Sequence, residues 1–197
     1  MKKISIYIAG SVRKDKEDAN SIFASEEIKA EITKALDGFE VIIFDPNESK
    51  ILGDGNSSRF GKDCLQVTSS NFIIADLREK RGIGVGSEMV IAKDRKIPVI
   101  SVCPAESHYK RTNIVFHEGT VNSDWAHPFV EMLSDAVVEN FTEAGYWIKK
   151  FIKNPTKIIS GAVVEESIKD YLDNYLENDA DFKKKYLYSL ENKSEYK

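Results

Sequence analysis

A short and almost unbroken apolar run at residues 72–77 restricts the fold of this chain more than any other segment. A parallel strand covered by helices on both faces has this composition. The run leads into residues 82–88, which contain three glycines, and then into an amphipathic pattern that Pro98 stops. We therefore predict a strand joined to a helix at residues 87–96 by a glycine-rich loop. Glycines in such a loop permit positive φ angles and the close approach of a ligand.

The same alternation of short apolar runs and amphipathic helices extends over the first half of the chain. It predicts further strands near 3–9, 40–44 and 98–103, a short fifth strand near 113–117, and further helices near 20–36 and 57–69. The fold class is therefore α/β, a flavodoxin-like or Rossmann-like doubly wound parallel sheet of five strands. Ligands bind such a sheet at the carboxyl ends of its strands.

The strand pattern stops near residue 127, and the rest of the chain reads as helix. One long helical pattern runs from His127-Pro128 to Asn154-Pro155, and two shorter patterns follow it. We predict an α/β domain at residues 1–127 and a helical extension at residues 128–197. The extension either packs on the domain or forms an oligomer interface.

Composition excludes several classes of function. The chain has 197 residues, 32 acidic and 28 basic side chains and a net charge of −4, so it has no basic field to hold polymeric nucleic acid. No apolar segment is long enough to span a bilayer. Cys64 and Cys103 lack the spacing of a disulfide framework or metal site, which predicts reduced thiols, no metal site and a cytoplasmic location. We also expect no cofactor.

Three polar or glycine-rich loops are predicted to meet at the carboxyl edge of the sheet. They are the first loop, with Gly10, Ser11 and Arg13, then Asp45 after the second strand, and the glycine loop after the third. The first loop has the groups that bind a phosphate or another small anion. An ordinary Gly-Ser turn with an exposed arginine is the alternative. The glycine loop is not GxGxxG, which argues against a dinucleotide, and a P-loop is excluded.

Glu88, Asp63 and Asp76 are the carboxylates nearest to these loops. Each has an ordinary explanation: Glu88 as a first-turn acid that satisfies the helix dipole, Asp63 as a solvent-facing helix residue, and Asp76 as a cap of the charged loop after it. Two or three carboxylates beside one crevice can also catalyse glycosyl transfer, in which one acts as the nucleophile and another as the acid.

These residues resemble the nucleoside 2-deoxyribosyltransferase superfamily, which includes the 2′-deoxynucleoside 5′-monophosphate N-hydrolases. The resemblance covers roughly residues 4–103. Its elements are residues 7–13, Asp63 eight residues before Asn71, the segment 84–88 that ends at Glu88, and residues 96–99.

The resemblance implies that Glu88 is the nucleophile that attacks the anomeric carbon, and that Tyr7 orients its carboxylate. Asp63 would act near the leaving base, as proton donor or hydrogen-bonding partner. The helix N-terminus would keep Glu88 ionised, and desolvation would raise the pKa of the neighbouring acid.

The form of the first loop is similar to that of the nucleotide hydrolases, which implies that Ser11 and Arg13 anchor a 5′-phosphate. Gly82, Gly84 and Gly86 would line the substrate site. Relatives often carry Ser or Asp at the position of Gly82. Either a backbone N–H or the preceding Arg81 therefore replaces that side chain, or the substrate differs. Family sites are often completed by a neighbouring subunit, which implies a homodimer or a higher homo-oligomer.

The leading hypothesis is cleavage of the N-glycosidic bond of a (deoxy)ribonucleoside 5′-monophosphate, with water as the final acceptor. A second hypothesis is base exchange between deoxynucleosides through the same ester on Glu88. A third is a nucleotide-binding sensor without turnover, which the missing side chain at Gly82 and the helical extension suggest.

Overall fold

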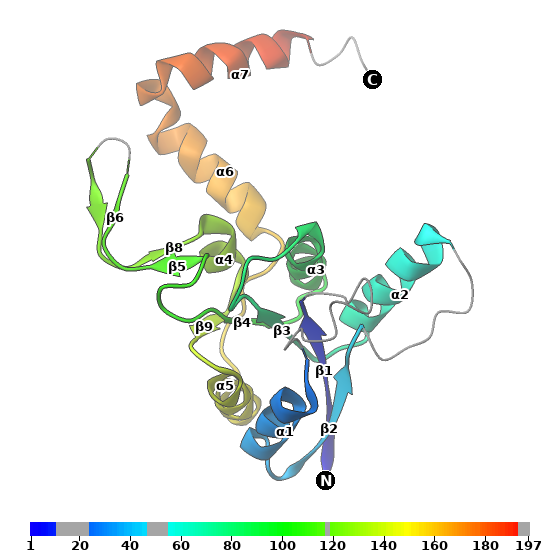
Figure 1. Cartoon of the computed structure of the whole chain (residues 1–197). Coiled ribbons are helices and arrows are strands. Elements are labelled where there is room, and N and C mark those ends of the chain that lie inside the picture. Colours follow the sequence, from blue (N-terminus) through cyan, green and yellow to red (C-terminus); the bar gives the residue numbers. More distant parts are fainter. Residues whose placement is uncertain (11–23, 47–54, 117–118, 193–197) are drawn as a thin grey trace. The chain divides into compact units, whose positions relative to one another are not determined.

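The computed structural model describes residues 1–10, 24–46, 55–116 and 119–192 (Figure 1). Its centre is a parallel sheet with the strand order β2-β1-β3-β4-β9. These strands are β1 (Lys2–Ala9), β2 (Phe39–Phe44), β3 (Phe72–Asp76), β4 (Val99–Val102) and β9 (Ala136–Val138). The predicted doubly wound five-stranded α/β fold is confirmed.

Four main helices cover the sheet: α1 (Glu26–Ala35), α2 (Asn56–Thr68), α3 (Ile83–Asp94) and α5 (Phe141–Lys153). Helices α1 and α5 pack together on one face, where alternate residues of β1, β3 and β4 form the core with them. Helix α3 packs on β1, β3 and β4 and also contacts α2. Because side chains alternate along a strand, the intervening residues, such as Tyr7, face α3.

The fifth strand is not the one predicted. Residues 113–117 were expected to complete the sheet, but β6 (Ile114–Val115) pairs only with β7 (Val121–Asn122), in an antiparallel hairpin. Strand β9 lies inside the stretch predicted as one helix over 128–154, which is divided into α4 (Pro128–Leu133), β9 and α5. Three residues are too few to show a strand period, and Ala136 and Val137 also fit a helical spacing.

The remaining elements form two smaller groups. Strands β5 (Lys110–Arg111) and β8 (Trp125–Ala126) form an antiparallel pair. Helix α6 (Val163–Asn174), a short 3₁₀ turn η2 (Leu176–Asn178) and helix α7 (Ala180–Asn192) follow α5. The chain divides into two compact units, Met1–Gly161 and Ala162–Lys197, so the predicted boundary at residue 127 falls within the first unit. None of the helices in the described ranges is long and apolar enough to cross a membrane.

Aromatic contacts hold the second unit together. The ring of Tyr171 is stacked on Tyr175 and lies edge-on to Phe182. The Tyr171 hydroxyl donates a hydrogen bond of 2.6 Å to Asp179. The two helical patterns predicted for this region are therefore present as α6 and α7.

The strand order indicates where a ligand-binding crevice lies in this sheet. From β1 the chain passes to β2 on one side and later to β3 on the other, so the order reverses between β1 and β3. In open α/β sheets the binding crevice lies outside the carboxyl ends of the strands at this point. Gly10 and Asp76 lie at these two ends, and Asp45 follows the neighbouring strand β2.

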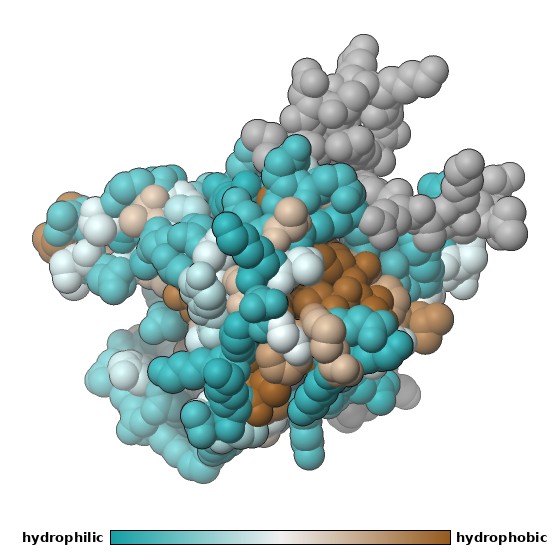
Figure 2. All heavy atoms as spheres, turned by 90° about the horizontal axis from the view of Figure 1, so that it is seen from below, coloured by the Kyte–Doolittle hydropathy of each residue, from teal (hydrophilic) through white to brown (hydrophobic). Residues whose placement is uncertain are grey.

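The opposite edge of the sheet carries a different surface. Figure 2 views the molecule from the side on which β1 begins, and apolar side chains gather there among hydrophilic ones. A groove of about 370 Å³ lies at the starts of β1, β3 and β4, with Ile4, Phe72 and Phe151 among its lining residues and Lys2 and Lys96 at its margin. Its lining has no carboxylate, so the groove lacks the groups that glycosyl chemistry requires.

The crossing of α1 and α5 depends on Gly145. A Cβ added there would lie 2.6 Å from the Ala35 Cβ, a distance that forces the helices apart. We expect Gly145→Ala to lower the free energy of unfolding by about 1–3 kcal/mol, although alanine favours helix. Gly61→Ala on exposed α2 is the matched control, because its Cβ meets no described atom within 4 Å. Urea unfolding should show a gain of about 0.5–1 kcal/mol for the control, and the same sign for both variants would contradict this account.

Candidate functional site

The site is built around one hydrogen bond between a strand and a helix. Tyr7 is fully buried in β1, and its hydroxyl donates to Oε1 of Glu88 at 2.8 Å. Oε2 of Glu88 is also buried and has no hydrogen-bond partner among the described residues. One oxygen of this carboxylate is therefore oriented, while the other keeps its lone pairs available.

Burial makes Glu88 a weaker acid than an exposed glutamate. Desolvation raises its pKa to about 7, the Tyr7 hydrogen bond lowers it in part, and the charge of Asp63 raises it. The pKa of Tyr7 is also raised, first by burial and then by Glu88, Asp63 and Asp45. The phenol therefore remains a hydrogen-bond donor throughout the physiological pH range.

Asp63 and Asp45 approach the same pair from other elements. Asp63 lies on α2, where burial raises its pKa and the adjacent Lys62 opposes the shift. Asp45, buried after β2, forms an ion pair of 3.2 Å with Lys29 of α1. The Nζ of Lys62 donates to the Pro46 carbonyl at 2.9 Å, which ties α2 to the end of β2. The structure thus brings Tyr7, Glu88, Asp63 and Asp45 together.

The glycine segment differs from its prediction. It was expected to be a loop before a helix at 87–96, but α3 begins at Ile83, so Gly84 and Gly86 are helical and Gly82 is the N-cap. Gly82 has φ −78°, and the described glycines with positive φ are Gly38 and Gly119. A Cβ at any of the three positions would meet no described atom within 4 Å, so neither backbone conformation nor packing explains these glycines.

This helix start also changes the surroundings of Glu88. The first turn of α3 contains no acidic residue, and Glu88 lies in the second turn. The dipole effect falls off within the first turn, so the predicted role of the helix N-terminus in keeping Glu88 ionised is wrong. Burial dominates instead and raises its pKa.

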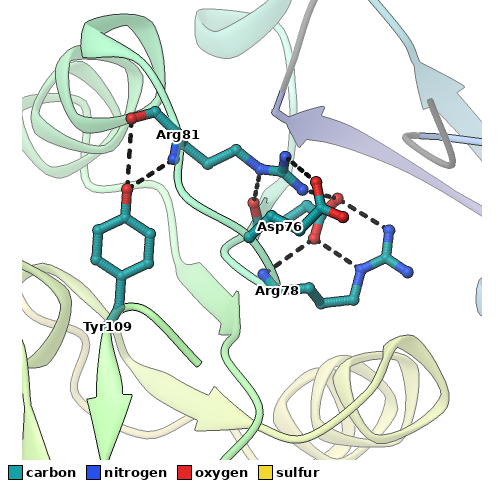
Figure 3. A network of polar contacts seen from close by, with 5 residues as sticks. Asp76, Arg78, Arg81 and Tyr109 are labelled. Carbon is teal, nitrogen blue, oxygen red and sulfur yellow. Dashed lines mark hydrogen bonds and ion pairs between the residues drawn. The ribbon is translucent and has the colours of Figure 1, made fainter. Parts of the chain in front are cut away.

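Asp76 does not belong to the group of carboxylates around Tyr7. Its side chain is fully buried and is held by two arginines, at 2.8 Å from Arg78 Nε and 2.8 Å from Arg81 Nη2 (Figure 3). This contact agrees with the alternative prediction for Asp76, in which its carboxylate caps the charged loop that follows β3. The Arg81 side chain is only 5% exposed and is bound to Asp76, so it does not replace a substrate-binding side chain at Gly82. Helix α3 has no side-chain cap, so the backbone N–H groups of its first turn are the groups that could bind substrate in place of a side chain at Gly82.

The first loop is described only in part. Gly10 follows β1 at a bend, whereas Ser11 and Arg13 lie outside the described residues. Among the residues that the structure does describe, no group of three or more His, Cys, Asp or Glu side chains could hold a metal ion. Cys64 and Cys103 are free thiols, as predicted.

Sequence reasoning missed Lys29 and Tyr109. Lys29 has the pattern of an ordinary helix surface residue, and only the fold brings it to the buried Asp45. Tyr109 contacts Arg81 across 28 residues, and no local motif marks it. Spatial proximity is the only signal for either residue.

Comparison with known proteins defines the fold class. No protein-family model matches the chain, and none of the curated proteins matches its sequence. Solved structures do match, and they give the chain the α/β fold of the 2-deoxyribosyltransferases. The resemblance read from the sequence motifs is thereby confirmed at the level of the fold.

Two solved structures carry this comparison. A 2-desoxiribosyltransferase from Leishmania mexicana is 20% identical with a TM-score of 0.51, and the match covers 78% of this chain and 99% of that one. A conserved protein from Enterococcus faecalis V583 is 18% identical with a TM-score of 0.53, over 75% of this chain and 98% of that one. A CMP N-glycosidase from Clostridium botulinum also aligns, but its TM-score of 0.39 is too low to indicate a shared fold.

Proposed function

We propose that this protein cleaves the N-glycosidic bond of a (deoxy)ribonucleoside 5′-monophosphate, with Glu88 as the nucleophile. Glu88 Oε2 forms an ester with the anomeric carbon as the bond to the base breaks, and Asp63 supplies a proton to the departing base. The deprotonated Asp63 then accepts a proton from water, which attacks the anomeric carbon, breaks the ester to Glu88 and releases the sugar phosphate. Tyr7 holds Oε1 during both steps.

The observation that carries this proposal is the unequal state of the two Glu88 oxygens. A nucleophilic carboxylate needs one oxygen fixed in direction and the other unshielded by hydrogen bonds. Tyr7 fixes Oε1 at 2.8 Å, and Oε2 has no partner among the described residues. An acid of purely structural purpose would be satisfied at both oxygens or exposed to water.

A phosphate on the substrate accounts for the three glycines at the start of α3. The N–H groups of the first turn have no side-chain cap, and the added Cβ atoms at Gly82, Gly84 and Gly86 meet open space. We propose that these N–H groups, with Gly10, Ser11 and Arg13, hold the sugar phosphate, and that Asp45 also faces the substrate. Base exchange is the second candidate, because the similar structure from Leishmania mexicana is a 2-desoxiribosyltransferase.

A single panel of assays tests the reaction. The protein is incubated with nucleosides and nucleoside 5′-monophosphates, and free base is measured by chromatography. Release from monophosphates but not from nucleosides is the expected result, and no release from any nucleotide would contradict the proposal. Addition of a competing base distinguishes exchange, which forms a new nucleoside, from hydrolysis. Tight nucleotide binding without turnover would favour a sensor.

The ionisation of Glu88 should control the pH dependence. Glu88 must be ionised to attack and Asp63 must be protonated to donate, so kcat/KM is expected to show a bell-shaped pH dependence with one limb set by the Glu88 pKa of about 7. Tyr7→Phe removes the hydrogen bond that lowers this pKa, and should therefore move the Glu88 limb to higher pH. Initial rates from pH 5 to 9 measure both effects. A flat profile over this whole range would contradict the assigned roles of Glu88 and Asp63.

We also propose that the protein acts as a homodimer or a higher homo-oligomer. Ile83 and Phe129 are 92% and 68% exposed, and both line an apolar cavity of about 180 Å³ beside the start of α3. Exposed apolar groups of this size beside a hollow are typical of association surfaces. Light scattering of the full chain tests this, and a monomeric mass at assay concentrations would contradict it.

A further inference from the structure

The connection between β3 and α3 is fixed by three residues, Asp76, Arg81 and Tyr109, which we call the α3 clamp (Figure 3). The Arg81 guanidinium donates to the backbone carbonyl of Asp76 at 2.6 Å and to its side chain at 2.8 Å. The Arg81 backbone N–H donates to the Tyr109 hydroxyl at 2.8 Å. Arg81 therefore joins the end of β3 to the segment that carries Tyr109.

The clamp is rigid because its charges are buried and paired. The Asp76 side chain is fully buried, and the Arg81 side chain is 5% exposed. Removing one partner from such a pair leaves a buried charge uncompensated, so the bonded arrangement strongly dominates. Arg78, which also binds Asp76, adds a contact over the Phe141 ring at 4.9 Å.

The first turn of the helix that follows has few side-chain contacts. Val85 is buried there, but Ile83 is exposed, Gly82 provides no capping side chain, and Gly84 has no side chain to pack. Gly82 and Gly86 line the cavity of about 180 Å³ that Tyr109 also lines, so packing does not fill the space beside them. The direction of α3 at its start therefore depends on the residue immediately before it, Arg81, as well as on the packing of Val85.

Glu88 lies one turn further along this helix, and its partner Tyr7 lies on β1. A small rotation of the first two turns would lengthen the 2.8 Å contact between them and change the direction of the other carboxylate oxygen, Oε2. Misplacement of a reacting group by about 1 Å can cost about 100-fold in rate.

We propose that Tyr109 and Arg81 are positioning residues that hold Glu88 against Tyr7 through the start of α3. This inference deepens the proposed function and depends on Glu88 as its nucleophile. It also makes the segment around Tyr109, which is remote in sequence, part of the catalytic support.

Tyr109→Phe tests the proposal because it removes only the hydroxyl and retains the ring, which lies edge-on to His108 and His127 at centroid distances of 4.8 and 6.0 Å. We expect kcat to fall about tenfold while KM changes less than about twofold. Weakening the Tyr7 contact should also raise the pKa of Glu88, since that contact lowers it. Carbon-13 NMR titration of the Glu88 carboxyl in the ligand-free protein measures this shift.

The matched control is Tyr146→Phe, at an exposed tyrosine on α5 that is 58% exposed. It should change neither kcat nor the Glu88 titration. A Tyr109→Phe protein that unfolds like the wild type and retains its kcat and its Glu88 titration would overturn the clamp proposal. If the wild type releases no base from any compound, the proposed function fails, and the NMR titration alone decides whether the clamp positions Glu88.

Discussion

Glu88→Gln is expected to lower base release by at least about 1,000-fold, because an amide oxygen cannot form the glycosyl ester. Glutamine can still accept the Tyr7 hydrogen bond through its carbonyl oxygen, so the geometry of the site is retained. Single-turnover assays with the most active nucleotide measure the loss. Intact-mass spectrometry should detect a sugar phosphate ester on the wild type and none on the variant. Activity within about tenfold of the wild type would exclude Glu88 as the nucleophile.

The same substitution should stabilise the fold above neutral pH. The folded pKa of Glu88 is about 7 and its ordinary value is 4.5, so the folded protein binds the proton more tightly than the unfolded chain. Stability is therefore lost as pH rises from about 4.5 to about 7, as the buried carboxyl ionises. Glutamine avoids this cost, which the shift places at about 3 kcal/mol.

Urea unfolding at two pH values tests the stability effect. Glu88→Gln should exceed the wild type at pH 8, and the difference should disappear near pH 4.5, where both side chains are neutral. Glu131→Gln, at an exposed position on α4, is the control and should change stability by less than about 0.5 kcal/mol at either pH. A variant less stable than the wild type at pH 8 would show that the carboxylate is satisfied in the fold.

Asp135→Ala is expected to lower the free energy of unfolding by about 3–5 kcal/mol. Asp135 forms a buried ion pair with Lys93, and the two side chains are 3% and 1% exposed. It also accepts hydrogen bonds of 2.7 Å from the backbone N–H groups of Val99 and Ile159. One carboxylate thus joins α3, β4 and the segment after α5. Its removal leaves the Lys93 ammonium and two backbone donors without their acceptor.

Substitution of each partner of this ion pair in turn gives a more specific test. Lys93→Met should cost less than Asp135→Ala, because the two backbone N–H groups still satisfy the carboxylate. Asp94→Ala is the matched control, since the Asp94 side chain is 73% exposed, and it should cost less than about 0.5 kcal/mol. Urea unfolding at pH 7 measures all three. Equal losses for Asp135→Ala and Asp94→Ala would show that the buried ion pair is not important for stability.

Much of the fold could be predicted from the sequence, because apolar runs of β1, β3 and β4 are long enough to show their period. Strand β9 was missed because three residues have no clear period and adjoin two helices. The start of α3 was placed four residues late because glycines usually break helices. In the structure the tertiary fold overrides that preference, with the clamp before the helix and packing on the sheet.

The candidate site was predictable in its residue types but not in its electrostatics. Tyr7, Asp63 and Glu88 follow from the motifs and their order in the chain. The sequence suggested that a helix dipole keeps Glu88 ionised, whereas burial raises its pKa to about 7. Lys93 has the pattern of a helix-terminal surface cation, yet it is buried against Asp135.

The sequence by itself determined the βα alternation, the parallel sheet and the identity of the residues at its carboxyl edge, because these depend on local periodicity and on chain order. Only the tertiary structure decided which carboxylates share one environment. Asp76 is neutralised by Arg78 and Arg81, while Glu88 is buried with one oxygen unpartnered among the described residues. The pKa and the reactivity of a carboxylate depend on desolvation and on the charges within a few ångströms, and these arise from residues that are far apart in the chain.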